Sequence, residues 1–242
     1  MNSNDVRERW AERSGEYSPD YYAYYGPDEA SDAVRARIEE VVGPDAAVLE
    51  LGCSSGRHLA HLREAGFRDL HGIDINDESF EVMAEAYPDL ADEGTFRADA
   101  IENAVTDFGD DRFDAVFSVE TLQHIHPDDA WVFEEVCRIT GDLLLTVEVE
   151  DGEASGPAGD GPEGGDDEGD GPEGGDAPAG GDGAVEDDAS AGSDVAAPDV
   201  NYVDEEVPLY YRDWNRVFTE LGLAEVDTES LDRDTLRAFR PA

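Results

Sequence analysis

The feature that most constrains the fold is residues 47–59, which read as a strand, a tight turn and the first turn of a helix. Residues 47–51 form an apolar run that includes one acid, and Gly52 and Gly56 let the chain turn sharply after it. Such a turn brings backbone N–H groups and the positive end of a helix dipole to the edge of a parallel sheet. We therefore expect a nucleotide-like ligand to bind at the carboxyl ends of the strands.

The spacing of the glycines narrows the class of ligand. A dinucleotide-binding fingerprint has glycines at positions one, three and six of the turn. Here Gly52 and Gly56 lie four residues apart, Ser54 takes the place between them, and Glu50 precedes the first glycine. The same strand, turn and helix also occur in α/β domains that bind no nucleotide. Alone, the turn leaves both interpretations open.

Two later strands end in acids that could face the same edge of a sheet. Residues 70–75 form a predicted strand with Asp74 at its end, 22 residues beyond the first glycine of the turn. An acid there can accept hydrogen bonds from both ribose hydroxyls. The alternative role, a cap for the next helix, is better filled by Asp77. Residues 94–100 form a shorter strand that leads to Asp99, which could instead be a turn aspartate bonded to its own backbone.

Strands and helices alternate as far as residue 150. Two further strands, 113–119 and 143–149, are continuous apolar runs of the kind found in buried parallel strands. A helix is expected from Pro127 to Gly141 between them, and an earlier helix begins near Pro27. Five strands that alternate with helices predict an α/β fold with a parallel sheet and right-handed crossovers.

The charge of the chain argues against nucleic acid and anionic membranes as partners, and it indicates the salt concentration in which the protein works. The formal net charge of the 242 residues is −46, and all 16 basic residues are arginine. So acidic a surface would repel nucleic acid and anionic membranes. It suits concentrated salt, where charge is screened within a few ångström, so we expect a halophilic protein. Stable folding in dilute buffer would contradict that expectation.

Residues 151–200 differ in kind from the rest of the chain. They contain no aromatic residue, leucine, isoleucine or arginine, and 16 acids, and the heptapeptide at 160–166 recurs at 170–176. Such a segment cannot bury enough apolar surface to become ordered. We predict a disordered acidic insert rather than a metal-binding loop, since it has no fixed ligand pattern. The two cysteines, Cys53 and Cys137, provide neither a disulfide framework nor a metal site.

The run 49–56, Leu-Glu-Leu-Gly-Cys-Ser-Ser-Gly, resembles the first motif of class I S-adenosylmethionine-dependent methyltransferases. Ser54 departs from the middle glycine of that motif. The segment after residue 206 supports the resemblance, because "Phe…Leu-Gly-Leu-Ala-Glu-Val" and a final strand are similar to the antiparallel closing pair of the family, here 223–227 and 235–240. The resemblance implies a three-layer, Rossmann-like, doubly wound sheet of seven mostly parallel strands, with the last strand antiparallel.

The resemblance also implies S-adenosylmethionine as the methyl donor and assigns roles to the residues at the strand ends. Glu50, Gly52 and Gly56 would shape the methionine and ribose pocket, Asp74 would hold the ribose and Asp99 the adenine amino group. The full predicted cofactor-binding set is Glu50, Gly52, Cys53, Ser54, Gly56, Asp74, Ile75, Asp99, Ala100 and Glu120. No metal is expected to take part.

The segment 120–127 follows the fourth strand and would flank the methyl-transfer site. Its pattern resembles the small-molecule branch of the family (type 11/12-like), and His124 matches a histidine common there. A neutral imidazole could accept a proton from an acceptor hydroxyl or amine, so His124 is the candidate catalytic base. The alternative is a structural histidine bonded to backbone. No Asn/Asp-Pro-Pro-aromatic motif stands at this place, which argues against methylation of bases or of glutamine.

These predictions give four parts to the chain. Residues 1–43 would be a helical, tyrosine-rich lid or an aromatic segment packed on the domain edge; 44–150 the cofactor-binding core; 151–200 the acidic insert; and 201–242 a helix and closing strand pair. The expected function is methyl transfer to a small-molecule O, N or C acceptor. The alternatives are a non-catalytic cofactor-binding or regulatory protein, a protein methyltransferase, and a nicotinamide-dependent oxidoreductase, whose glycine spacing does not match. No leader or long apolar run is seen, so a soluble cytoplasmic protein is expected.

Overall fold

A seven-stranded sheet forms the centre of the computed structural model, which describes residues 1–14, 18–150, 200–203 and 207–242. The described residues all belong to one compact unit. The predicted acidic insert lies outside the described residues, apart from Val200.

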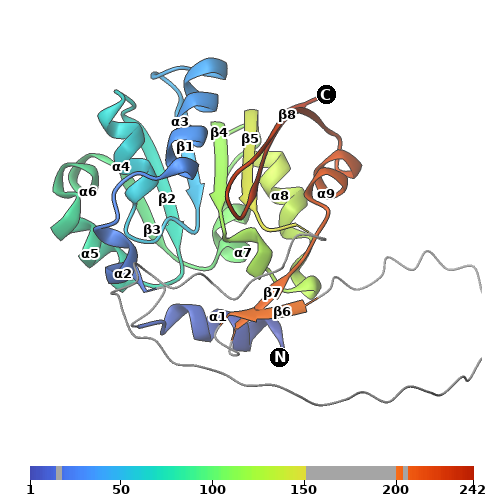
Figure 1. Ribbon diagram of the computed structural model, residues 1–242, viewed down its shortest axis with the longest axis horizontal. Coiled ribbons are helices and arrows are strands. Elements are labelled where there is room, and N and C mark those ends of the chain that lie inside the picture. Colours follow the sequence, from blue (N-terminus) through green and yellow to red (C-terminus); the bar gives the residue numbers. More distant parts are fainter. Residues whose placement is uncertain (15–17, 151–199, 204–206) are drawn as a thin grey trace, which may run out of the picture. The chain divides into compact units, whose positions relative to one another are not determined.

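The sheet has the strand order β3-β2-β1-β4-β5-β9-β8 (Figure 1). Strands β1 to β5 pair in parallel, and β9 runs antiparallel to both of its neighbours, β5 and β8. The predicted fold class, with its antiparallel last strand, is confirmed. The strands are β1 Ala47–Leu51, β2 Asp69–Asp74, β3 Thr95–Ala98, β4 Phe113–Val119, β5 Thr140–Glu148, β8 Leu223–Ser230 and β9 Thr235–Pro241.

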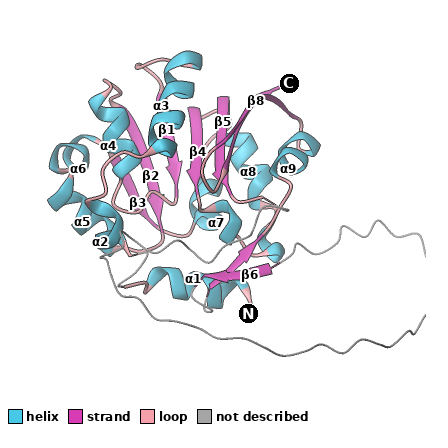
Figure 2. Cartoon of the chain, in the orientation of Figure 1, coloured by secondary structure: helices cyan, strands magenta, loops and turns pink. Residues whose placement is uncertain are grey.

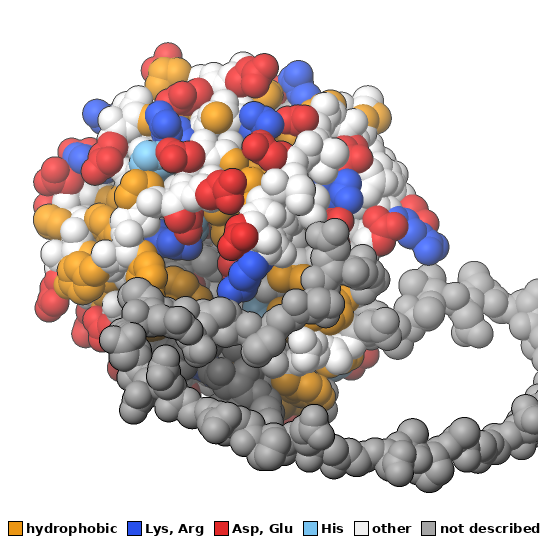
Figure 3. Space-filling model, in the orientation of Figure 1, with side chains coloured by type: hydrophobic (Ala, Val, Ile, Leu, Met, Phe, Trp, Pro, Cys, Tyr) orange, Lys and Arg blue, Asp and Glu red, His pale blue; other side chains and the backbone are white. Residues whose placement is uncertain are grey.

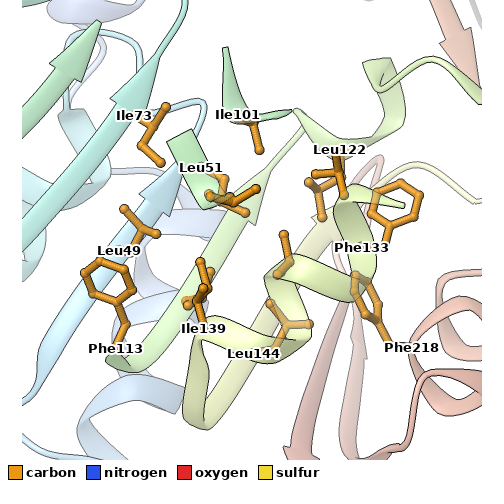
Figure 4. Close-up of a cluster of buried hydrophobic side chains, with 14 of the residues drawn as sticks. Leu49, Leu51, Ile73, Ile101, Phe113, Leu122, Phe133, Ile139, Leu144 and Phe218 are labelled. Carbon is orange, nitrogen blue, oxygen red and sulfur yellow. The ribbon is translucent and has the colours of Figure 1, made fainter. Parts of the chain in front are cut away.

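Helices cover both faces of the sheet (Figure 2), so the central strands are buried on both sides. Successive residues of β1 alternate between two cores, with Leu49 in one and Val48 in the other. On the side of Val48 lie α3 Glu29–Val41, α4 Arg57–Glu64, α5 Glu78–Ala86 and α6 Pro88–Glu93. On the side of Leu49 lie α7 Ile101–Ala104, α8 Val132–Ile139 and α9 Trp214–Glu220. Figure 4 shows this second core, which joins Leu49 and Leu144 of the sheet to Phe133 and Phe218 of the helices.

The local signals for helix ends are mostly confirmed. Asp28 caps α3, accepting a 2.8 Å hydrogen bond from the amide of Ser31, whose hydroxyl in turn accepts from the amide of Asp28. Helix α8 ends earlier than the glycine at 141 suggests. Thr140 turns to extended backbone and starts β5, and its hydroxyl donates to the carbonyl of Val136.

The bounds of several elements were not predicted from the sequence. Two short helices, α1 Ser3–Ala11 and α2 Pro19–Ala23, precede α3, and a hairpin of β6 Val200–Val203 and β7 Val207–Tyr210 precedes α9. Short 3-10 turns follow α7 and β4, namely η1 Val105–Asp107, η2 Leu122–His124 and η3 Pro127–Asp129. The hairpin strands have little apolar alternation of their own. Contacts with the turn after β4, which the chain order does not reveal, hold the hairpin in place.

The surface is acidic, with arginines set among the carboxylates (Figure 3). None of the helices that the structure describes is long and apolar enough to cross a membrane.

Candidate cofactor-binding site

The predicted site residues gather at the carboxyl ends of neighbouring strands. Strand β1 lies between β2 and β4, and the chain order reverses there, because β2 and β3 extend the sheet to one side of β1 and β4 and β5 to the other. Ligands of open α/β sheets bind at such a switch point. The glycine turn follows β1, Asp74 ends β2, Asp99 follows β3 and Glu120 follows β4.

The turn after β1 has three residues in left-handed backbone conformation, Gly52 (φ 72°), Ser54 (φ 46°) and Gly56 (φ 81°). The amides of Gly52 and Cys53 both donate to the carbonyl of Ile73, at 2.9 and 3.0 Å, so the turn is tied to the end of β2. A serine with positive φ is strained where a glycine would not be. The departure of Ser54 from the motif therefore costs conformational energy.

Close packing explains why the two outer positions of the turn are glycines. A Cβ on Gly52 would lie 2.3 Å from the side chain of Thr121, which follows β4. A Cβ on Gly56 would lie 2.7 Å from the methyl group of Met83. The turn is thus packed against the segment after β4 on one side and against α5 on the other.

Asp74 is a half-buried carboxylate that organises the turn. Its Oδ2 accepts from the amide of Ser54 at 2.7 Å, and its Oδ1 accepts from the amide of Asn76 at 2.9 Å and the hydroxyl of Ser79 at 3.3 Å. Burial raises the pKa of Asp74, while these hydrogen bonds act to lower it. Three of about four lone-pair positions are occupied, so the carboxylate has room for one ribose hydroxyl rather than two.

Asp99 is more fully engaged. Its Oδ2 accepts from two nitrogens of Arg97, and its Oδ1 accepts from the amide of Ala100 and the side chain of Asn103. Burial acts to raise the pKa of Asp99, but the hydrogen bonds from Asn103, Arg97 and Ala100 outweigh it, and the pKa lies below its ordinary value. An adenine amino group would have to share an oxygen with one of these donors.

Glu50 is buried inside β1, on the sheet face covered by α3 and α4. Burial raises its pKa well above the ordinary value, against the opposing effect of Arg57, and Asp74 raises it further. Its Oε2 has no hydrogen-bond partner among the described residues. Burial likewise raises the pKa of the Cys53 thiol, so this cysteine is an uncharged packing residue of the turn.

Glu120 follows β4 in a left-handed conformation, with φ 49°. Its carboxylate accepts a 3.1 Å hydrogen bond from Arg233, in the turn between β8 and β9. The neighbouring Asp234 has its pKa raised to about 8, first by burial and then by the charge of Glu120. The closing strand pair therefore contributes to the site, which the sequence did not indicate.

His124 lies in η2, and its Nδ1 is 3.0 Å from the carbonyl of Pro208. Because a carbonyl only accepts, Nδ1 carries the proton, and Nε2 has the lone pair. Burial lowers the pKa of His124 to about 4, so the ring is neutral at pH 7. It also packs against Trp10 of α1, with ring centroids 4.8 Å apart. His124 therefore bonds backbone through Nδ1, as a structural histidine would, and Nε2 keeps the lone pair that a base needs.

The N-terminal segment contacts the edge of the sheet at two further points. The carbonyl of Arg13 accepts from the side chain of Asn76 at 3.1 Å, and that of Ala23 from the hydroxyl of Tyr87 at 2.6 Å. Tyr22 lies over the guanidinium of Arg57. These contacts place the aromatic N-terminus near the glycine turn, whereas Tyr24 and Tyr25 are exposed.

Two charged residues near the site were missed by the sequence analysis. Glu148, at the end of β5, and Arg212, before α9, are both buried and both bond to the backbone that follows β4. An acid at the end of a buried strand was the signal that identified Asp74, and it could have identified Glu148. No pattern in the sequence points to Arg212.

The residues present fit an adenosyl cofactor in part. Asp74 has acceptor capacity left, Glu50 Oε2 is an acceptor without a partner, and the glycine turn has the geometry that the motif requires. Among the described residues no group of three or more His, Cys, Asp and Glu side chains is arranged to hold a metal ion.

Comparison with known proteins identifies a family that part of the chain resembles. Residues 48–142 match the family model of a methyltransferase domain. No curated protein matches the sequence.

Three solved structures share the fold. The 1,6-didemethyltoxoflavin-N1-methyltransferase of Burkholderia thailandensis, with S-adenosylhomocysteine bound, has 14% sequence identity and a TM-score of 0.59, over 88% of this chain and 79% of that chain. Magnesium protoporphyrin IX methyltransferase of Synechocystis, also with S-adenosylhomocysteine, has 11% identity and a TM-score of 0.61 over 100% of both chains. The [4+2]-cyclase SpnF has 14% identity and a TM-score of 0.53, over 86% of this chain and 63% of that chain.

At these identities the structural similarity establishes the fold, and the family match covers the part of the chain that carries the glycine turn, Asp74, Asp99 and Glu120. Residues 48–142 thus match a methyltransferase domain, and they lie in a Rossmann-like sheet whose fold is shared with solved methyltransferase structures.

Proposed function

We propose that the protein transfers a methyl group from S-adenosylmethionine to an O, N or C atom of a small-molecule acceptor. The observation that carries the proposal is that one stretch, residues 48–142, matches a methyltransferase domain and contains Asp74, whose carboxylate bonds the glycine turn. Two of the similar structures are, by name, methyltransferases of toxoflavin and protoporphyrin compounds, which supports a small-molecule acceptor.

The proposed cofactor contacts follow from the position of each residue. Asp74 takes one ribose hydroxyl with its remaining acceptor position, and Ile75, half-buried beside it, packs against the adenine. Asp99 and the amide of Ala100 border the adenine end. Glu50, the turn from Gly52 to Gly56, and Glu120 surround the methionine end.

The catalytic contribution of this chain is mainly positioning. The cofactor supplies a methyl group on a sulfonium, and transfer needs an acceptor held in line with it and shielded from water. His124, neutral and with its lone pair on Nε2, can accept a hydrogen bond from an acceptor hydroxyl or amine and so orient it. Its low pKa makes it a weak base, which suits an acceptor that loses its proton only as the bond forms.

The N-terminal residues 1–43 are proposed to cover the cofactor and acceptor, since they already contact His124, Asn76 and Tyr87. We also propose a soluble, cytoplasmic protein that works in concentrated salt, on the strength of its acidic composition.

A second candidate, a protein that binds the cofactor without transferring its methyl group, has one observation in its favour. The fold is shared with a [4+2]-cyclase, so the sheet alone does not fix the reaction. A protein acceptor in place of a small molecule is the third possibility.

One experiment separates these functions. The protein is incubated with S-adenosylmethionine labelled in the methyl group and with a metabolite extract or a protein extract, and the labelled product is identified. Label in a small molecule supports the proposal, and label in protein alone favours a protein methyltransferase. Binding measured by calorimetry without transfer to either extract favours the non-catalytic alternative.

A further inference from the structure

The short segment after β4, residues 120–125, carries both Glu120 and His124 and closes one side of the proposed site. The amide of Glu120 donates to the carbonyl of Val147 at 2.8 Å, which continues the pairing of β4 with β5. Beyond it the chain leaves the sheet in a single 3-10 turn, where the amide of Ile125 donates to the carbonyl of Leu122 at 3.1 Å. So short a turn leaves most of its own backbone groups to be satisfied from outside.

Glu148 satisfies the amides at the start of this turn. Its Oε1 accepts from the amides of Thr121 and Leu122, at 3.3 and 3.1 Å, and its Oε2 accepts from the amide of Gln123 at 3.2 Å. The hydroxyl of Ser118 adds a fourth hydrogen bond to the same carboxylate, at 2.6 Å. A fully buried carboxylate is thus bonded to three successive backbone amides.

Arg212 satisfies carbonyls of the same turn. Its guanidinium, which is buried, donates to the carbonyls of Leu122 and Ile125, and also to that of Tyr210. Three aromatic rings surround the guanidinium, those of Phe133, Tyr210 and Trp214, at 5.3, 5.4 and 5.5 Å. The rings fix the plane of the fork, so its hydrogen bonds have a set direction.

The two charges therefore hold opposite kinds of backbone group in one turn. The carboxylate bonds the amides and the guanidinium bonds the carbonyls, the order that the dipole of a helical turn favours. Burying a carboxylate and a guanidinium is costly, and each offsets that cost through hydrogen bonds to this segment. Two buried charges thus bond to one segment of five residues. They hold this segment more firmly than an ordinary surface loop is held.

The segment also packs closely against the glycine turn. Thr121 lies against Gly52, where a Cβ would approach to 2.3 Å. Any shift of Thr121 therefore moves one wall of the glycine turn, and the same shift moves His124 and Glu120 with it.

We propose that Glu148 and Arg212 are positioning residues for methyl transfer, which act through the backbone of residues 121–125 rather than by touching cofactor or acceptor. The proposal rests on the proposed function, because methyl transfer is the reaction that these residues would assist. The hydrogen bonds themselves are independent of that function, so the two can fail separately.

The test combines amide hydrogen exchange with calorimetric titration of S-adenosylhomocysteine, both on the full chain. Glu148→Gln is compared with Glu150→Gln, a carboxylate two residues further along that bonds the side chain of Arg237 and no other side chain in the described part of the chain. Arg212→Lys is compared with Arg237→Lys, since the guanidinium of Arg237 bonds the carboxylates of Glu150 and Glu225. Each control alters the ion pair between Glu150 and Arg237 without touching residues 121–125.

Glu148→Gln should lower the protection of the amides of Thr121, Leu122 and Gln123 by about tenfold or more, since hydrogen bonds to a charged group are the strong ones. Arg212→Lys should do the same at Ile125. Both variants should weaken S-adenosylhomocysteine binding by roughly tenfold while amides in the middle of β4 keep their protection. That combination distinguishes local positioning from loss of the fold.

Three results would overturn some part of the proposal. Rapid exchange of these amides in the unaltered protein would show that Glu148 and Arg212 do not hold residues 121–125 in place. This result needs no variant, so it counts even if Glu148→Gln fails to fold. Binding by the unaltered protein, with Glu148→Gln equal to Glu150→Gln in both measurements, would remove the positioning role alone. Absence of binding by the unaltered protein would overturn the proposed function itself.

Discussion

The amide of Ser54 donates a 2.7 Å hydrogen bond to Asp74 Oδ2, and this contact joins the turn after β1 to the end of β2. The other oxygen of the same carboxylate accepts from the amide of Asn76. One side chain thus fixes two backbone segments at the edge where we propose that the cofactor binds. Its remaining acceptor position has room for a single ribose hydroxyl, so both its structural role and its proposed binding role can be measured.

Asp74→Ala should weaken S-adenosylmethionine binding by about tenfold or more, because hydrogen bonds to a charged group contribute about 1.5–3 kcal/mol each. Calorimetry gives the affinity. Asp77→Ala is the matched control, since Asp77 is exposed and makes no capping hydrogen bond. Equal affinities in the two variants would rule out the proposed ribose contact.

Gly52→Ala should lower the free energy of unfolding by about 2 kcal/mol or more, because the residue has positive φ and its new Cβ would overlap Thr121. Gly109→Ala is the control, since nothing lies within 4 Å of a Cβ there. Urea unfolding of both variants measures the difference. If Gly52→Ala were as stable as Gly109→Ala, the close approach of the turn to Thr121 would be wrong.

His124→Asn should reduce the rate of methyl transfer by roughly 100-fold, the lower end of what a positioned acid–base group contributes. An asparagine side chain can still donate to the carbonyl of Pro208, so the anchor of the hairpin is kept while the lone pair at Nε2 is lost. The rate is measured with the acceptor that the labelling experiment identifies. An unchanged rate would leave His124 with the structural role only.

Much of the fold could be predicted because its signals are local. Apolar runs located the strands of the parallel sheet, and the glycine turn identified the switch point between β1 and β4. The hairpin of β6 and β7 could not be predicted, since its place depends on a contact between Pro208 and His124, 84 residues apart. Such contacts leave no periodic pattern in the sequence.

For the candidate site, the sequence predicted where the acids lie but not which groups they bond. Asp74 and Asp99 were expected at strand ends, and they lie there. That Arg97 and Asn103 engage Asp99 on both oxygens, or that Arg212 bonds the turn after β4, follows only from three-dimensional packing. The pairing of Glu120 with Arg233 likewise depends on the return of the chain in β9.

The pH dependence of stability should depend on Glu148. Burial raises its pKa from the ordinary 4.5 to about 7, against the hydrogen bonds from Ser118 and the turn amides. Arg212 and Asp234 are titratable groups whose charges interact with it. A carboxyl whose pKa is higher in the folded state binds its proton more tightly there, so its contribution to stability is greatest below about pH 4.5 and is lost as the pH rises through about 7.

Urea unfolding of the unaltered protein and of Glu148→Gln, from pH 5 to pH 8, tests this. The free energy of unfolding of the unaltered protein should fall relative to that of the variant up to about pH 7 and then stay level. Glu150→Gln, whose carboxylate is paired with Arg237, serves as the control. Curves for the unaltered protein and Glu148→Gln that stay parallel throughout would contradict the raised pKa.

The most direct test of the account is a calorimetric titration of the unaltered protein with S-adenosylmethionine, with the reduced nicotinamide cofactor titrated in parallel. We expect saturable one-to-one binding of S-adenosylmethionine, weakened by Asp74→Ala and not by Asp77→Ala, and no binding of the nicotinamide cofactor. Binding of the nicotinamide cofactor, or S-adenosylmethionine binding that is indifferent to Asp74, would contradict the assignment of this site.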